Sequence, residues 1–201
     1  MPTSSVKICV FCGASTRAEL VYQDEALHLG ELMAKKGFSL VFGGGKVGLM
    51  GVTADSVLRN GGKAYGFIPD FLDDIEGAHP GLTELHIVDS MHTRKCNMEK
   101  MADAFIVLPG GFGTLDEFFE ILTWRQIKLH NKPIVVINTN NYWGALKALM
   151  KQVVCEKFAK PEHLDYVVFV NSAQEAIEYY EELIKQKKLA PQANALGVNT
   201  I

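Results

Sequence analysis

The sequence predicts a doubly wound α/β fold, in which helices cover both faces of a parallel sheet. Runs rich in Val, Ile and Phe recur along the chain, and amphipathic segments long enough for helices lie between most of them. This alternation is typical of parallel strands joined by right-handed crossovers. The 201 residues, of which 48% are hydrophobic and 21% charged, suffice for one well-buried domain. We expect that domain to cover 1–188, followed by a poorly ordered tail over 189–201, because the tail lacks a pattern.

The apolar runs predict about seven strands of a Rossmann-like sheet. They lie near residues 6–12, 38–43, 63–69, 84–88, 104–109, 133–139 and 166–171. Ligands of such sheets bind in the crevice outside the carboxyl ends of the strands. The residues that follow each run are therefore the candidates for a site. The segment 71–83 has no clear periodicity and predicts a longer loop or a short helix over the crevice, in the place of a lid.

Four strand ends, which we expect to be neighbours, carry chemically distinctive residues. The first run ends in the small and hydroxylated stretch 12–16, which contains Ser15. The second enters the glycine turn 43–46, with Gly44, Gly45 and Lys46, and the fourth precedes a helix that opens with Met91 and the pair Arg94-Lys95. Cations at helix N-termini oppose the helix dipole. A bound anion, held by dipoles and side chains together, explains their placement.

The fifth run leads through Pro109 and a glycine-rich turn into a helix. The glycines at 110, 111 and 113 let the backbone approach a ligand closely, and the free N–H groups at the start of the helix favour a phosphate. Thr114 and Glu117 leave two interpretations open. Their spacing fits a capping box, which would make Glu117 structural, but it also places a carboxylate beside a bound phosphate. Glu120, one turn later on the same face, is a second candidate or a solvated helix residue.

Gly43-x-Gly45-x-x-Gly48 offers a further alternative, because it matches the dinucleotide-binding fingerprint and Asp70 follows at a suitable distance. The turn follows the second strand, however, and its lysine suits a terminal phosphate equally well. A dinucleotide oxidoreductase and a purely structural glycine turn both remain open at this point.

Other classes of function are disfavoured. A net charge of −3 gives no electrostatic case for nucleic acid or an anionic membrane surface. The six histidines lack metal-ligand spacing, Cys9 and Cys12 would face opposite sides of a strand, and serine-hydrolase, Walker A and zinc-protease motifs are missing. No apolar run is long enough to span a bilayer and residues 1–5 lack the features of a signal peptide, so we expect a cytoplasmic protein without metal or membrane.

Several of these motifs together carry a family resemblance that covers most of the chain. Pro-Gly-Gly-x-Gly-Thr-x-x-Glu ends at Glu117, and Arg94-Lys95 lies upstream. Further matching stretches are 11–13, 42–51, 123–126 and 130–133. The chain resembles the LONELY GUY (LOG) family, cytokinin riboside 5′-monophosphate phosphoribohydrolases. It departs from the usual pattern at Ala14-Ser15 and Lys128-Leu129, which bears on the preferred base.

The resemblance implies hydrolysis of the N-glycosidic bond of a purine nucleoside 5′-monophosphate, such as AMP or N6-prenyl-AMP, by a homodimer that needs no cofactor. It implies catalytic roles for Arg94 and Glu117. The implied substrate-binding residues are Ser15, Gly44, Gly45, Lys46, Met91, Lys95, Gly110, Gly111, Gly113, Thr114 and Glu120. Members of this family are often labelled lysine decarboxylases, but no lysine here is identified as a Schiff-base partner for pyridoxal phosphate. The rival from another class is a non-catalytic nucleotide carrier or sensor.

Overall fold

The computed structural model describes residues 5–192, apart from the side chains of residues 74–76. One sheet holds seven strands in the order β4-β3-β2-β1-β5-β6-β7, and every neighbouring pair is parallel. The strands are β1 (Lys7–Phe11), β2 (Ser39–Phe42), β3 (Ala64–Pro69), β4 (Glu84–Val88), β5 (Ala104–Val107), β6 (Ile134–Ile137) and β7 (Val167–Val170). The predicted α/β fold with about seven strands is confirmed.

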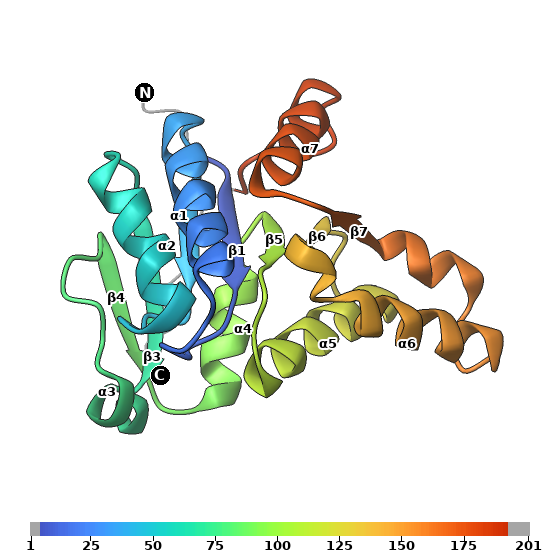
Figure 1. Ribbon diagram of the computed structural model, residues 1–201, viewed down its shortest axis with the longest axis horizontal. Helices are drawn as coiled ribbons and strands as arrows, with labels where there is room; N and C mark the ends of the chain where they lie inside the picture. Colours follow the sequence, from blue (N-terminus) through green and yellow to red (C-terminus); the bar gives the residue numbers. More distant parts are fainter. Residues whose placement is uncertain (1–4, 193–201) are drawn as a thin grey trace.

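Helices cover both faces of the sheet (Figure 1). The α-helices are α1 (Leu20–Lys35), α2 (Gly48–Arg59), α3 (Asp70–Glu76), α4 (Met91–Met101), α5 (Phe112–Gln126), α6 (Gly144–Cys155) and α7 (Ala173–Lys185), and two 3₁₀ turns are η1 (Thr139–Asn141) and η2 (Pro161–Tyr166). Helices α1, α2 and α7 share one apolar cluster with one face of the strands, and α4, α5 and α6 share the other cluster. Because both faces are buried, the central strands are continuous apolar runs.

Side chains along β1 illustrate the alternation. Ile8 and Val10 belong to the cluster shared with α1, whereas Cys9 and Phe11 belong to the cluster shared with α5. Cys9 and Cys12 therefore fall on opposite sides of the sheet, as their spacing predicts, and both thiols are free. Burial raises the pKa of each thiol well above its ordinary value, so both stay protonated at neutral pH.

The strand order reverses between β1 and β5. From β1 the chain builds outward through β2 and β3 to the edge strand β4, returns to the centre at β5, and then builds outward in the other direction. The loops that follow β1 and β5 consequently diverge and leave a crevice at the carboxyl ends of these strands. The expectation that four strand ends are neighbours is wrong for β4, which lies at the edge, three positions away from β1.

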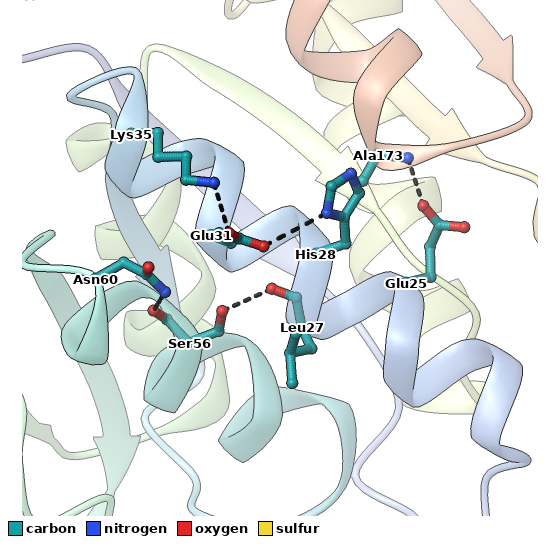
Figure 2. A network of polar contacts seen from close by, with 8 residues as sticks. All are labelled: Glu25, Leu27, His28, Glu31, Lys35, Ser56, Asn60 and Ala173. Carbon is teal, nitrogen blue, oxygen red and sulfur yellow. Dashed lines mark hydrogen bonds and ion pairs between the residues drawn. The ribbon is translucent and has the colours of Figure 1, made fainter.

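Helices α1, α2 and α7 are tied together by polar contacts (Figure 2). The Ser56 hydroxyl on α2 donates a hydrogen bond to the Leu27 carbonyl on α1, at 2.6 Å, and Glu25 on α1 accepts one from the first amide of α7, that of Ala173. The two helices α1 and α2 also approach closely at Gly30, where a Cβ would lie 2.6 Å from the Cβ of Ser56. These contacts hold the three helices together on one face of the sheet.

Two of the less regular segments have defined places. The segment 71–83 begins with the short helix α3, in agreement with one of the two predicted alternatives. Leu189 is buried, and the Gln192 amide donates to the Asp103 carboxylate at 2.8 Å, so the first part of the expected poorly ordered tail packs on the body. Residues 193–201 lie outside the described part of the chain. Among helices of residues 5–192, none is long and apolar enough to cross a membrane.

Candidate active site

A cavity of about 690 Å³ occupies the crevice between the loops that follow β1 and β5. Its wall combines residues 12–15 and 17–19, the first turn of α2, one residue of α3, the residue that follows η1, and the starts of α4 and α5. Most exposed surface inside it is apolar, and polar side chains come from the loop after β1 and from the starts of α4 and α5. This composition is typical of a small-molecule site.

Glu117 contributes a carboxyl that faces the cavity. It is half-buried, and within residues 5–192 it has no hydrogen-bond or ion-pair partner. Burial raises the pKa of Glu117 to about 7, against the opposing charge of Arg94. A titratable group with a strongly raised pKa in a cavity is typical of a functional residue.

The capping-box interpretation of Glu117 is wrong. Helix α5 starts at Phe112 with Gly111 as its N-cap, and no side chain caps it. Thr114 therefore stands inside the first turn, where it is buried, and the Glu117 side chain is not used to close the helix start. The observed N-cap lies three residues before the threonine that the pattern suggested as N-cap.

Arg94 is a buried cation held by backbone carbonyls. Its Nε donates to the Phe67 carbonyl and its Nη2 to the Gly43 carbonyl, each at 3.0 Å, while Nη1 lies 3.7 Å from the sulfur of Met91. A guanidinium has five N–H groups, so two remain without a partner within the described chain. Helix α4 thus reaches back under the ends of β2 and β3 and presents Arg94 to the cavity that Glu117 also lines.

Gly43 leaves the space that the Arg94 guanidinium occupies. A Cβ at Gly43 would lie 1.8 Å from Nη2 of Arg94, a distance that no side chain tolerates. Gly48 has φ +59°, and a Cβ there would lie 2.4 Å from the carbonyl carbon of Ala14. Two glycines of the apparent dinucleotide fingerprint are therefore explained by packing, one around an arginine and one against the loop after β1.

The start of α5 supplies donors for an anion. Gly110, Gly111, Gly113 and Thr114 line the cavity, and Ser15 faces them from the loop after β1. The first amides of a helix have no partner inside the helix and attract negative charge. Space is tight at Gly110, where a Cβ would lie 2.1 Å from the Thr114 hydroxyl oxygen. A phosphate site at this turn stays a prediction.

Other predicted substrate ligands lie outside the cavity wall. Lys95 pairs with Asp116 at 3.0 Å and with Glu120 at 3.1 Å, so these charges satisfy one another on the surface of α4 and α5. Gly44 accepts a backbone hydrogen bond from His79, and Gly45 forms a β-bridge with Ala78. Together with the Lys46 amide, which donates to the Gly77 carbonyl, they anchor the segment after α3. The 44–46 turn thus anchors this segment through its backbone, and its predicted contact with the substrate stays a prediction.

The cavity also contains residues that sequence reasoning missed. Arg17 lines it beside Ser15, Leu72 reaches it from α3, and Tyr22 and Tyr142 form one side. The rule that ligands collect at strand ends points to Arg17, which lies just after the first strand, and to Tyr142, which lies just after the sixth. The residues predicted from four strand ends do not include Arg17, which follows the first strand, or Tyr142, which follows the sixth.

A family model described as "Possible lysine decarboxylase" matches residues 50–180. A cytokinin riboside 5′-monophosphate phosphoribohydrolase of Rhodococcoides fascians is 43% identical over 171 residues, which cover 85% of this chain and 86% of that protein. One of Arabidopsis thaliana is 37% identical over 185 residues, or 92% of this chain and 87% of that protein. A probable member from Oryza sativa subsp. japonica is 38% identical over 189 residues, or 94% and 85%.

Solved structures share the fold at lower identity. A molybdenum cofactor binding protein from Rippkaea orientalis has a TM-score of 0.69 and 21% identity, over 90% of this chain and 98% of that one. A Moco carrier protein from Chlamydomonas reinhardtii also has a TM-score of 0.69, with 17% identity over 91% and 99%. These two support the architecture alone. The family model and the relatives, which match over most of their length, show that the chain belongs to the cytokinin riboside 5′-monophosphate phosphoribohydrolase (LOG) family.

Proposed function

We propose that this protein hydrolyses the N-glycosidic bond of purine nucleoside 5′-monophosphates, AMP or N6-prenyl-AMP, to the free base and ribose 5-phosphate. One observation carries the proposal: the Glu117 carboxyl, unpaired within the described chain, shares a cavity with Arg94 and with the anion-binding start of α5. A sugar held by its phosphate at that turn would have a carboxylate within its own cavity. The relatives that carry the phosphoribohydrolase name give the same substrate class.

The chemistry requires stabilisation of positive charge on the ribose. As the bond between C1′ and the purine nitrogen breaks, its electrons go to the base and C1′ acquires oxocarbenium character. Ionised Glu117 would accept hydrogen bonds from the ribose hydroxyls, favour that positive charge and orient the water that adds to C1′. The proton that this water loses balances the one that the departing base gains. The free N–H groups of Arg94 would hold the nucleotide and balance the charge that develops on the leaving side.

The residues that line the cavity suit the two parts of a nucleotide. Gly111, Gly113 and Thr114 with Ser15 would bind the phosphate, and Arg17 would add a positive charge to the same cavity. Apolar side chains of the lining would contact a purine and an N6 substituent. These are Leu49, Met50, Leu72 and Met91.

The rival function is a non-catalytic nucleotide carrier. Two solved structures named as cofactor binding or carrier proteins share the fold, but their low identity extends the likeness no further than the fold. A carboxylate can bind ribose hydroxyls in a carrier as well, whereas a glycosidic hydrolase requires one for the reaction itself. Cleavage of the bound nucleotide therefore separates the two functions. The decarboxylase description of the family model has no matching residue, because no lysine is among the described residues that line the cavity.

Incubation with a panel of plain and prenylated nucleoside monophosphates, followed by chromatography of the products, tests the proposal. We expect free base and ribose 5-phosphate from wild type and far slower release from a Glu117→Gln variant. Tight binding of AMP without any release of adenine by wild type would favour the carrier. Release of adenosine and phosphate would indicate a phosphatase.

We also propose that the protein acts as a homodimer. Apolar side chains of α5, α6 and the loop after α6 remain exposed, among them Phe112 at 92%, Leu149 at 52% and Phe158 at 84%. Exposed apolar surface of this extent is typical of a contact between copies. Light scattering should give twice the chain mass of 22.2 kDa, and a monomer at micromolar concentration would contradict it.

A cytoplasmic location belongs to the same proposal. All four cysteines, which lie within the described chain, are free. Free thiols are typical of a reducing compartment.

A further inference from the structure

Tyr142 makes a contact that the proposed mechanism does not use. It follows η1 at the carboxyl end of β6, lines the cavity, and its hydroxyl donates a 2.7 Å hydrogen bond to the Gly110 carbonyl oxygen. We propose that Tyr142 is a positioning residue that sets the orientation of the phosphate-binding turn through this carbonyl. The inference rests on the proposed function, because it assigns to that turn the 5′-phosphate of the substrate.

The effect follows from the geometry of one peptide unit. In a trans peptide the carbonyl oxygen and the following N–H point in opposite directions within one plane. The bond from Tyr142 to the Gly110 carbonyl therefore also fixes where the Gly111 N–H points. That N–H has no hydrogen-bond partner within residues 5–192. It is the donor that precedes the first turn of α5, where the cavity collects its other anion-binding amides.

An external restraint is needed because both residues of this peptide are glycines. Glycine adopts many backbone conformations at little energetic difference, so the orientation of the Gly110–Gly111 unit is weakly determined by the chain itself. On its other side, the turn is held by the Gly13 amide, which donates to the Pro109 carbonyl at 3.0 Å. Tyr142 restrains the next carbonyl along the chain, the one that precedes the unpaired amide.

Tyr142 is itself held by an unusual turn. Asn140 and Asn141 have φ of 54° and 57°, in the left-handed region, which asparagine adopts more often than most residues other than glycine. The Asn138 side chain ties this turn together, since its oxygen accepts from the Trp143 amide at 2.7 Å and its nitrogen donates to Asn141 at 3.2 Å. A non-glycine turn in this conformation persists only where its surroundings determine it, as is common at functional sites.

Helix α1 supports the same turn from the other side. The Thr139 hydroxyl donates to Glu25 at 2.9 Å, and Glu25 also accepts from the start of α7 (Figure 2). The ring of Tyr22 meets the ring of Tyr142 edge-on, with centroids 5.5 Å apart. Helix α1 thus contacts both the turn that precedes Tyr142 and the ring of Tyr142 itself.

The test replaces Tyr142 by phenylalanine, which keeps the ring and removes the hydroxyl. The matched control is Tyr179→Phe on α7, which removes a hydroxyl away from the cavity. We expect Tyr142→Phe to raise the dissociation constant for ribose 5-phosphate and the KM for AMP by about three- to tenfold, the range of one hydrogen bond. The expected kcat stays within about twofold, because the phosphate is bound equally in the ground and transition states.

Two results would overturn the positioning role. One is an unchanged affinity for ribose 5-phosphate in Tyr142→Phe. The other is an equal loss in Tyr179→Phe. The proposed hydrolase function is tested separately, by whether wild type releases adenine from AMP. If wild type releases adenine while Tyr142→Phe binds ribose 5-phosphate normally, only the role of Tyr142 is refuted. If wild type does not bind ribose 5-phosphate, the positioning role fails, whereas the hydrolase function still depends on adenine release. If wild type binds ribose 5-phosphate but releases no adenine, the hydrolase function fails.

Discussion

Replacement of Glu117 by glutamine should slow catalysis and stabilise the fold at the same time. The substitution keeps the size of the side chain and removes its ability to ionise. An ionised carboxylate that holds the ribose and orients water contributes about 10²–10⁴-fold to the rate. We therefore expect kcat/KM for AMP to fall by about that factor. A purely structural residue at this position would not combine lost activity with increased stability.

The gain in stability follows from the raised pKa of Glu117, about 7 in the folded protein against an ordinary value of 4.5. Between these two values the folded state binds more protons than the unfolded state, so stability falls as pH rises through that window. Above it, ionised Glu117 destabilises the fold by up to about 3 kcal/mol, and below about pH 4.5 the contribution vanishes. Glutamine does not ionise, so the variant lacks this destabilisation, although its side chain is still a buried polar group. We expect its free energy of unfolding to exceed that of wild type by about 1–3 kcal/mol at pH 8.

Urea denaturation followed by circular dichroism measures the difference, for wild type and Glu117→Gln side by side at pH 8 and pH 4.5. The account predicts a more stable variant at pH 8 and a much smaller difference at pH 4.5. A variant that is about 1 kcal/mol less stable than wild type at both pH values, with activity retained, would refute the reasoning and restore a helix-capping role.

Four further outcomes follow from the same cavity. Arg94→Lys should lower kcat/KM roughly 10–100-fold in steady-state assays, because lysine cannot make the same set of directed hydrogen bonds; unchanged kinetics would contradict the role of Arg94. Gly43→Ala should lower kcat/KM to a similar extent with an unchanged circular dichroism spectrum, since the new Cβ would displace the Arg94 guanidinium, 1.8 Å away. Wild-type activity of this variant would show that the observed position of the guanidinium is unnecessary. Arg17→Ala should raise the KM for AMP about two- to fivefold without changing kcat, as expected for an exposed charge, and a loss in kcat alone would contradict phosphate binding. In wild type, kcat/KM should rise with pH and level off near the Glu117 pKa of about 7. If Glu117→Gln showed the same rise of kcat/KM with pH, that rise would belong to another titrating group.

The sheet and its helices are predictable from the sequence because buried strands and amphipathic helices have distinct periods. All seven predicted runs lie within a few residues of β1 to β7. Strand order is not predictable in the same way, since pairing between distant strands leaves no local pattern. The expectation that the four strand ends are neighbours fails at β4 for this reason.

The sequence predicts those parts of the cavity that a local motif forms. It does not predict the parts that depend on tertiary contacts. The turn with Gly111, Gly113 and Thr114 is visible in the sequence because glycines, a hydroxyl and a helix start are adjacent there. The 44–46 turn has the pattern of a phosphate site, but its orientation depends on the segment after α3, with which it pairs. Tyr142 escapes prediction because its contact with Gly110 joins residues that are 32 positions apart.

Local patterns also overestimate the burial of α5. Phe118 lies in the core, as its helical spacing suggests, but Phe119 is 38% exposed and Leu129 is 67% exposed beyond the end of the helix. The apolar stripe of an isolated helix does not reveal whether it meets the same chain or a second copy. The exposed part of this stripe lies beside Glu120 and Trp124 and adjoins the surface for which we propose a dimer contact.

A crystal structure of the Glu117→Gln variant with AMP tests the central claim most directly, because slow turnover should leave the nucleotide intact. The account predicts the phosphate against the first amides of α5 and the side chain at position 117 within hydrogen-bond distance of the ribose hydroxyls. A phosphate bound elsewhere, with that side chain turned away from the sugar, would contradict it.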